Sequence, residues 1–342
     1  MIDLTTSYLG IPIKNPLVIG ASNLVTDRGN LVKLEEAGAA AIVYKSLFEE
    51  QIQLESYALE QETELYEDWD AEHASIFPKL GHAGPEEHLL KLKKVKEALN
   101  IPVIGSLNCV YEDTWEEYAL KMADTGIDAL ELNFYANVID PNKTGPSIIG
   151  DQVNTLKRVK DAVKIPVSVK LSPYYTNTLG VIMQMDEAGA DGFVLFNRLF
   201  QPDIDIEREE HHFPFNFSVS RDHRLALRYA GLLYSNVKGT VCSNTGVITG
   251  EDALKMILAG ADTVQVVSAI YNKGISHISQ MLEDMTRWME SKGYHKLSDF
   301  RGKLAKSNLS DPFAYKRAQY VDILMKSEIF MQYHPKDGDD FL

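Results

Sequence analysis

Ala188-Gly189-Ala190 leads directly into the apolar run Phe193-Val194-Leu195-Phe196-Asn197, and this stretch decides the fold because the chain repeats it. A small-Gly-small turn at the end of an amphipathic segment passes into a short apolar run three more times, within residues 37–45, 125–133 and 259–267. Such a glycine caps a helix, and an apolar run without polar alternation is typical of a strand buried on both faces. The repeat therefore predicts a parallel sheet fed by helices.

Apolar runs and helical periodicity extend this pattern along the chain. The predicted strands cover residues 16–20, 41–45, 101–107, 129–133, 165–171, 193–197, 239–243 and 263–267. Segments with a period near 3.6 lie between them, at about residues 28–37, 85–99, 113–124, 148–163, 177–188, 221–235, 250–259 and 275–291. Strict alternation of eight strands and eight helices predicts an α/β protein with a (β/α)8 TIM barrel, and a doubly wound open sheet is the competing architecture.

The 342 residues would fit about two average domains, or one large barrel with insertions. We expect a single barrel domain over residues 1–342, with rim insertions at residues 46–84 and 198–219 and a C-terminal helical extension at residues 292–342. Both insertions follow strands, where long loops commonly act as lids or contact partners. The acidic first insertion is equally compatible with a solvated surface loop.

Composition excludes several classes of protein. Apolar residues make up 45% of the chain, which is enough for a full core, and the formal charge of -15 disfavours binding to nucleic acid or to an anionic membrane. Two cysteines, Cys109 and Cys242, form neither a disulfide framework nor a metal-binding motif, so we expect no metal site. Without a signal peptide or a long apolar run, the sequence predicts a cytoplasmic protein.

Polar side chains stand where the predicted strands end, and in a barrel these positions form the active site. They include two lysines and several amides and hydroxyls: Ser22, Asn23, Lys45, Ser46, Asn108, Asn133, Lys170, Asn197, Asn244, Thr245 and Ser268. A buried amide or ammonium without a partner is costly, which points to a bound polar ligand. The loops after the seventh and eighth strands, where barrels most often bind phosphate, favour a phosphorylated ligand.

Lys45 and Lys170 could serve either of two chemistries. A strand-end lysine can form a Schiff base, or it can remain charged and stabilise negative charge on a ring. The neighbouring Ser46 and Asn133 suit a planar heterocycle, so we favour the second role.

Taken in order, these motifs resemble those of dihydroorotate dehydrogenases and of the related flavin domain of dihydropyrimidine dehydrogenase. The matching segments are Ala21-Ser22, Lys45-Ser46, Glu131-Leu132-Asn133, Val169 to Pro173, Asn197, Thr245 to Ala253 and Gln265 to Ala269. The resemblance runs from about residue 10 to 285 and implies an FMN-binding barrel.

The resemblance also implies which residues hold FMN. The ring and ribityl contacts would come from Ala21, Ser22, Lys45, Ser46, Asn133 and Lys170, and the main chain at Gly246, Val247, Val267 and Ser268 would hold the phosphate. The family usually has glycine where Val247 and Val267 stand. Because main-chain N–H groups make these contacts, a side chain is tolerable if φ stays negative. Soluble members are commonly homodimers, and electron transfer beyond the flavin would need an unknown partner because this chain has no iron–sulfur cysteine cluster.

The half of the site that binds substrate departs further from the family. Relatives carry a cysteine or serine base soon after the Glu-Leu-Asn motif, whereas this chain continues Phe134-Tyr135-Ala136-Asn137. The family's amide-bearing substrate loop is represented only by residues 74–80, which lack both amides. Three asparagines remain as expected contacts to a pyrimidine-like substrate: Asn133, Asn137 and Asn197.

Tyr135 is the candidate catalytic acid, with Lys45 as the second catalytic candidate. A phenol keeps its proton at neutral pH, so Tyr135 suits reduction of a double bond better than oxidation of dihydroorotate. Cys109 is expected to be a buried apolar residue. Three histidines on the rim insertions, His82, His211 and His212, are reserve acids or bases.

Three functions follow, in order of preference. The first is an FMN-dependent oxidoreductase acting on the CH–CH group of dihydroorotate or of another small planar pyrimidine-like molecule. The second is a flavin-binding protein that has lost dihydroorotate turnover. The third is a lysine-dependent aldolase or isomerase on the same barrel.

Overall fold

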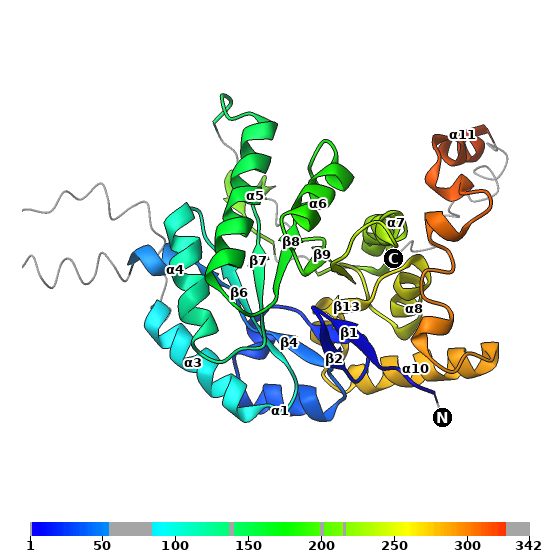
Figure 1. Ribbon diagram of the computed structural model, residues 1–342, viewed down its shortest axis with the longest axis horizontal. Helices are drawn as coiled ribbons and strands as arrows, with labels where there is room; N and C mark the ends of the chain where they lie inside the picture. The colour runs from blue at the N-terminus through cyan, green and yellow to red at the C-terminus, as the bar shows by residue number, and fades with distance from the viewer. Residues whose placement is uncertain (1, 55–83, 137–139, 199–201, 215–216, 326–342) are drawn as a thin grey trace, which may run out of the picture.

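The computed structural model describes residues 2–54, 84–136, 140–198, 202–214 and 217–325. Within them a closed barrel of short parallel strands forms the centre of the molecule (Figure 1). Its strands are β3 (Leu17–Ile19), β4 (Ala41–Val43), β6 (Val103–Asn108), β7 (Ala129–Asn133), β8 (Val167–Leu171), β9 (Gly192–Leu195), β12 (Thr240–Ser243) and β13 (Thr263–Val266). Pairing of β4 with both β3 and β6 closes the ring, and β5 (Leu47–Phe48) adds to the end of β6.

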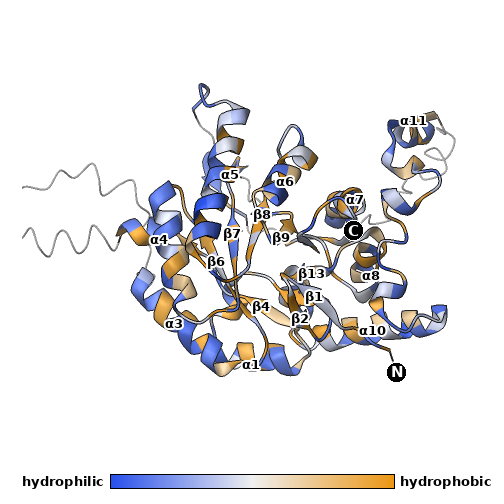
Figure 2. Cartoon of the chain, in the orientation of Figure 1, coloured by the Kyte–Doolittle hydropathy of each residue, from blue (hydrophilic) through white to orange (hydrophobic). Residues whose placement is uncertain are grey.

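Helices surround this barrel and connect its strands. They are α1 (Arg28–Glu36), α3 (Pro85–Ala98), α4 (Glu112–Ala123), α5 (Gly145–Ala162), α6 (Thr178–Glu187), α7 (His223–Leu233), α8 (Gly250–Ala259) and α10 (His277–Lys292), with the short α9 (Ser268–Lys273) before α10. The predicted TIM barrel is confirmed, and the open sheet is wrong because the strands close on themselves. Figure 2 shows these helices with mixed polar and apolar surfaces around the largely apolar strands.

The small-Gly-small turns end helices as predicted. Gly38, Gly126, Gly189 and Gly260 all have positive φ. At Gly260 a side chain would also clash, because an added Cβ would lie 2.7 Å from Cβ of Tyr234. The repeated glycine is therefore required because the backbone adopts a positive φ where each helix ends and the chain enters the next strand.

An N-terminal hairpin covers one end of the barrel. Its strands, β1 (Thr6–Tyr8) and β2 (Ile11–Ile13), pair antiparallel, and Tyr8 and Leu9 are buried against residues at the N-terminal ends of the barrel strands. The main-chain N–H of Leu9 donates to Oγ1 of Thr240 at 3.2 Å. This end of the barrel is plugged, and the cavity described below lies at the other.

Side chains alternate between the barrel interior and the surrounding helices. On β7, Leu130 and Leu132 join the core that includes the helices, while Ala129 belongs to the separate small cluster inside the barrel. By the same alternation Glu131 and Asn133 point inward. The interior is therefore apolar near the hairpin and becomes polar toward the carboxyl ends of the strands.

The insertions and the extension are described only in part. The second insertion contains a hairpin of β10 (Asp203–Asp205) and β11 (Glu210–His212), and the extension contains α11 (Arg317–Met325), which projects from the barrel (Figure 1). Most of the acidic first insertion lies outside the described residues. None of the described helices is long and apolar enough to cross a membrane.

Candidate active site

A cavity of about 530 Å³ opens at the carboxyl ends of the barrel strands, within the size range of small-molecule and cofactor sites. Its lining contains the predicted site residues Ala21, Ser22, Lys45, Ser46, Asn133, Tyr135, Lys170, Asn197, Gly246, Val247, Val267 and Ser268. The remaining predicted residue, Asn137, lies outside the described residues. Residues far apart in the sequence therefore meet at one cavity, as strand-end positions in a barrel should.

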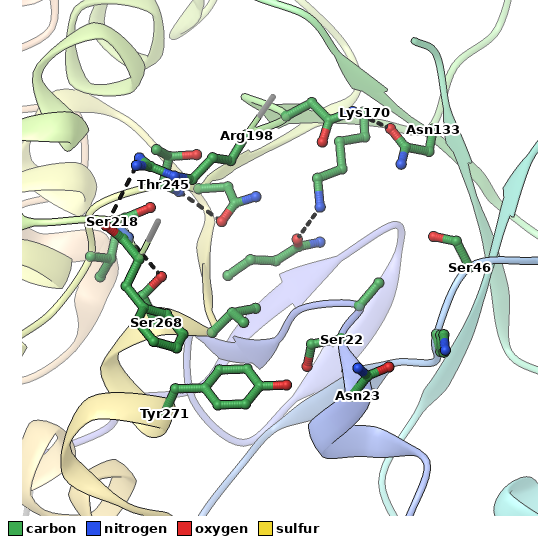
Figure 3. Close-up of a pocket in the computed structure, with 18 of the residues that line it drawn as sticks. Ser22, Asn23, Ser46, Asn133, Lys170, Arg198, Ser218, Thr245, Ser268 and Tyr271 are labelled. Carbon is green, nitrogen blue, oxygen red and sulfur yellow. Dashed lines mark hydrogen bonds between the residues drawn. The ribbon is translucent and has the colours of Figure 1, made fainter. Parts of the chain in front are cut away.

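Lys170 occupies the floor of the cavity and is almost fully buried. Its Nζ donates to Oε1 of Gln265 at 3.4 Å (Figure 3). Nζ also lies 3.6 Å from Oε1 of Glu131, beneath the lining of the cavity. Lys45, just beyond β4, contributes a second ammonium group and is only half-buried. The two lysines differ, since Lys170 is almost fully buried and anchored by interior side chains, whereas Lys45 is partly exposed.

Asn133 and Asn197 are joined by a hydrogen bond across two strand ends. Nδ2 of Asn197 donates to Oδ1 of Asn133 at 2.6 Å. This bond occupies the Asn133 oxygen and leaves its NH2 group as the donor available to a ligand. Asn133 also neighbours Lys170 in the register of β7 and β8, so an amide and an ammonium lie side by side on the wall of the cavity.

The loop after β12 has a constrained backbone at Thr245 and Gly246, with φ of 69° and 76°. The Thr245 hydroxyl donates to the carbonyl of Phe196 at 3.0 Å, and the main-chain N–H of Thr245 donates to Oδ1 of Asn244 at 2.7 Å. An added Cβ on Gly246 would lie 2.6 Å from the main-chain nitrogen of His223, so only glycine fits. A positive φ at a residue other than glycine, as at Thr245, is energetically unfavourable and is typical of functional loops.

Asp252, in the first turn of α8, holds the next part of that loop. Its Oδ2 accepts from the N–H groups of Ile248 and Thr249 at 3.2 and 3.1 Å and from the hydroxyl of Ser220 at 2.5 Å. These bonds lower the pKa of Asp252 overall, although burial is the largest single influence and acts in the opposite direction. The carboxylate thus fixes the loop that carries Gly246 and Val247.

The loop after β13 begins α9, and Oγ of Ser268 accepts from the main-chain N–H of Ser218 at 3.0 Å. Val267, at φ −138°, packs over Gly20, where an added Cβ would lie 2.8 Å from the valine Cγ2. Neither Val247 nor Val267 has a positive φ. A valine side chain is therefore compatible with the backbone at both positions where the family usually has glycine.

These features fit FMN. The cavity offers a glycine-bearing turn and a second strand-end loop for a phosphate, two ammonium groups for an electron-rich ring, and polar side chains between them. Ser22 also has a buried Oγ with no hydrogen-bond partner among the described residues. A buried hydroxyl of this kind is satisfied by a ligand or water that enters the cavity.

The loop after β7 contains one buried and one exposed aromatic residue. Phe134 packs edge-on against Trp115 at a ring separation of 5.2 Å, whereas Tyr135 lines the cavity with 42% of its surface exposed. Cys109 is buried as predicted, and burial raises the pKa of its thiol far above the ordinary value. It cannot replace the missing thiol base.

The two reserve histidines among the described residues do not line the cavity. His211 and His212 are exposed on β11, and His82 lies outside the described residues. Nε2 of His212 lies 4.0 Å from Oδ2 of Asp203 in the same hairpin.

Some cavity residues received no role from the sequence. Gln265 links Lys170 to Glu131, and Arg198 pairs with Asp222 at 2.7 Å while lining the cavity. Tyr271 and Phe217 also line it, with ring centres 5.3 Å apart. The position of Arg198 directly after Asn197 was a usable signal, whereas Gln265 and Glu131 come together only when the barrel closes.

Comparison with known proteins gives one family and consistent relatives. Residues 4–289 match the family described as dihydroorotate dehydrogenase. The chain is similar to the dihydroorotate dehydrogenase B (NAD(+)) catalytic subunits of Methanocaldococcus jannaschii (28% identical over 301 residues, 84% of this chain and 94% of the relative) and Thermoplasma acidophilum (27% over 315 residues, 88% and 99%). It is also similar to dihydroorotate dehydrogenase A (fumarate) of Lactobacillus helveticus (26% over 220 residues, 63% and 71%).

Proposed function

The chain belongs to the dihydroorotate dehydrogenase family, and from this premise we propose that it acts on the CH–CH group of dihydroorotate or of another small planar pyrimidine-like substrate. Members of this family are FMN-dependent oxidoreductases, as the sequence motifs predicted. The lysine-dependent aldolase or isomerase is therefore set aside.

FMN, when bound, supplies a ring that exchanges two electrons with a substrate. We assign the phosphate to the main chain at Gly246, Val247, Val267 and Ser268, and the ring and ribityl contacts to Ala21, Ser22, Lys45, Ser46, Asn133 and Lys170. Two ammonium groups beside an electron-rich ring stabilise negative charge there. The loop and cavity geometry described above supports these assignments.

Substrate binding is assigned to Asn133, Asn197 and Asn137. The bond from Asn197 to Asn133 orients both amides before a ligand arrives, which reduces the entropy lost on binding. Arg198 adds a positive charge to the cavity wall next to this pair. A planar molecule with both donors and acceptors on its edge suits this arrangement.

Tyr135 would hold a proton at its hydroxyl for transfer to a substrate carbon. The observation that carries the proposal is the combination of an FMN-binding wall with a loop in which Tyr135 stands near the position of the family's thiol or serine. Because a phenol keeps its proton at neutral pH, Tyr135 favours reduction of a double bond. Lys45, at the mouth of the cavity, is the second group able to donate a proton there.

The experiment is anaerobic photoreduction of the FMN-loaded protein, followed by stopped-flow mixing with orotate, uracil, fumarate or a quinone. Rapid reoxidation by orotate or uracil, with formation of the dihydropyrimidine, would support the proposal. A protein that binds no FMN would overturn it. Rapid reoxidation confined to fumarate or a quinone would leave the pyrimidine substrate unsupported.

A second candidate is a flavin-binding protein that has lost dihydroorotate turnover. The specific observation in its favour is that the loop has no thiol or serine and that the nearby Cys109 is buried. This candidate predicts FMN binding without reduction by any dihydropyrimidine and without reoxidation by any acceptor in the same panel.

We further propose a partner subunit for electron transfer, because two of the relatives above are named as catalytic subunits. Apolar side chains exposed on the loops that follow β6, β8 and β11 support a contact surface, for example Val110, Tyr174 and Phe213. A cytoplasmic homodimer is the simplest assembly without that partner. Analytical ultracentrifugation of the purified chain measures its assembly directly.

A further inference from the structure

A group of polar side chains lies inside the barrel, beneath the cavity floor. Glu131 on β7 is completely buried, Gln265 on β13 is 1% exposed, and Lys170 on β8 reaches down to both. The rest of the described interior nearer the hairpin is largely apolar. A carboxylate at this depth requires an explanation, because an uncompensated buried charge costs several kcal/mol.

The contacts form a closed triangle. Nε2 of Gln265 donates to Oε2 of Glu131 at 2.6 Å, while Oε1 of Gln265 accepts from Nζ of Lys170 at 3.4 Å. The third side is the 3.6 Å separation between Nζ of Lys170 and Oε1 of Glu131. Glu131 therefore acts on the ammonium both directly and through the amide, which it orients so that the amide oxygen faces the lysine.

Besides Lys170, two titratable side chains among the described residues face Glu131, and both are neutral. Tyr8 faces it from the hairpin and Cys242 from β12, and burial raises the pKa of both, to about 12 for the thiol. Both groups are therefore neutral at physiological pH. The ion pair recorded for Glu131 among the described residues is with Lys170, so Lys170 is the cation that compensates its charge.

We propose that Glu131 is a positioning residue that fixes the Lys170 ammonium at the cavity floor, directly and through Gln265. The Gln265 oxygen accepts one N–H of the ammonium, and the carboxylate attracts the ammonium from 3.6 Å, so the other N–H groups are left for the cavity. The inference rests on the proposed contact between Lys170 and FMN. It extends that proposal by naming the residues that hold the lysine in place.

The test is the Glu131→Gln variant, which keeps the shape of the side chain and removes its charge. The readout is the midpoint potential of bound FMN. Without the carboxylate the ammonium leaves the floor, so the potential should fall toward that of Lys170→Met. We expect reduced FMN to bind at least tenfold more weakly relative to oxidised FMN, which corresponds to a fall of about 30 mV for a two-electron couple.

The opposite sign would overturn the inference. If the ammonium stayed in place without Glu131, loss of a negative charge would raise the potential. An unchanged potential in Glu131→Gln would overturn it equally.

A double-variant cycle separates positioning from a general structural effect. In the Lys170→Met background, Glu131→Gln should change the potential by less than a third of its effect in the wild-type background. An equal effect in both backgrounds would show that Glu131 does not act through the lysine. Ser168→Ala is the matched control, since Ser168 is as fully buried as Glu131, lies on β8 two residues before Lys170, and donates to the main-chain carbonyl of Leu130 rather than to the lysine or the carboxylate.

If Glu131→Gln does not fold, Gln265→Met breaks the bridge and leaves the carboxylate in place. It should lower the potential in the same direction but less, and no change would count against the inference. Failure of the proposed function is a separate result. It would appear as wild-type protein that does not bind FMN, whereas failure of this inference would appear as FMN-loaded protein whose potential ignores Glu131.

Discussion

The two sides of the cavity are held in different ways. The cofactor side, which we define as Ser22, Lys170 and the loops at residues 244–249 and 267–268, is fixed by backbone geometry and buried side chains. The substrate side, defined as Asn133 to Ala136 with Asn197 and Arg198, has a single amide pair and an exposed tyrosine at its centre. The cofactor side keeps the family's pattern apart from valine at positions 247 and 267, and the substrate side departs from it further.

This difference shows which functional properties can be inferred from a family resemblance. Main-chain contacts on the cofactor side depend on φ and on a few glycines, so they survive changes such as valine at positions 247 and 267. Proton transfer on the substrate side depends on the chemistry of one side chain, which substitution changes outright. The cofactor can therefore be inherited while the substrate changes.

The largest expected effect tests the substrate side. Tyr135→Phe removes the proposed acid, and a positioned acid contributes about 10²- to 10⁴-fold to a rate. We expect the rate of reoxidation by the active substrate to fall by about that factor, while FMN binding stays within about twofold because the phenol lies outside the cofactor side. Stopped-flow absorbance and FMN fluorescence titration measure the two quantities. An unchanged rate would remove Tyr135 from the mechanism.

The next effect tests the backbone of the cofactor side. Gly246→Ala places a Cβ 2.6 Å from the main-chain nitrogen of His223 at a positive φ. Strain of about 1–3 kcal/mol together with this clash should weaken FMN binding roughly 100-fold. Fluorescence titration with FMN provides the measurement.

The matched control for that change is Gly150→Ala, in α5, where an added Cβ meets nothing within 4 Å. It should leave FMN affinity unchanged and stabilise the fold by about 0.5–1 kcal/mol. If Gly246→Ala bound FMN as well as this control does, the loop after β12 would not hold the phosphate.

A pH effect of intermediate size is expected outside both sides, at His88 on α3. His88 packs edge-on against Tyr44 next to Lys45, and burial, followed by the charges of Lys45 and Lys91, lowers its pKa from 6.5 to about 4. Between these values the unfolded chain binds a proton that the folded protein does not. The unfolding free energy is therefore unaffected by His88 above pH 6.5 and decreases as the pH drops toward 4. The group should cost about 2 kcal/mol of unfolding free energy on going from pH 7 to 5.

Urea unfolding at both pH values measures this contribution. His88→Phe should remove about 2 kcal/mol of the difference, because the imidazole Nε2 is buried without a partner among the described residues and a phenyl ring needs none. His212→Gln, on exposed β11, should leave the difference unchanged. Equal pH dependence in His88→Phe and wild type would show that His88 does not titrate as described.

Sequence reasoning could predict the barrel because its signals are local. Each strand is a short apolar run, and the turn before it needs a glycine, as at Gly189 and Gly260. The residues that end the strands were predictable for the same reason, since topology alone sends them to the mouth.

The partners of those residues were not predictable. Glu131 and Gln265 are separated by 134 positions in sequence and face each other across the barrel, where only ring closure and strand register bring them together. The buried position of Glu49 was also unforeseen, because the acidic insertion was as compatible with a solvated surface loop as with a lid or contact loop. This carboxylate accepts from the N–H of Val110 at 3.0 Å and the hydroxyl of Thr114 at 3.2 Å. Long-range partners decide whether a charge is buried, and composition does not contain them.

The smallest expected effect returns to the cofactor side. Val267→Gly restores the residue usual in the family and removes the side chain that covers Gly20. Glycine's backbone entropy and the lost contact should lower the unfolding free energy by about 1–2 kcal/mol. FMN affinity should stay within about threefold, because the main-chain N–H that would meet the phosphate is retained at this position. A large loss of FMN affinity with little loss of stability would mean that the valine side chain itself contacts the cofactor, and the cofactor side would then depend on side-chain identity as much as the substrate side does.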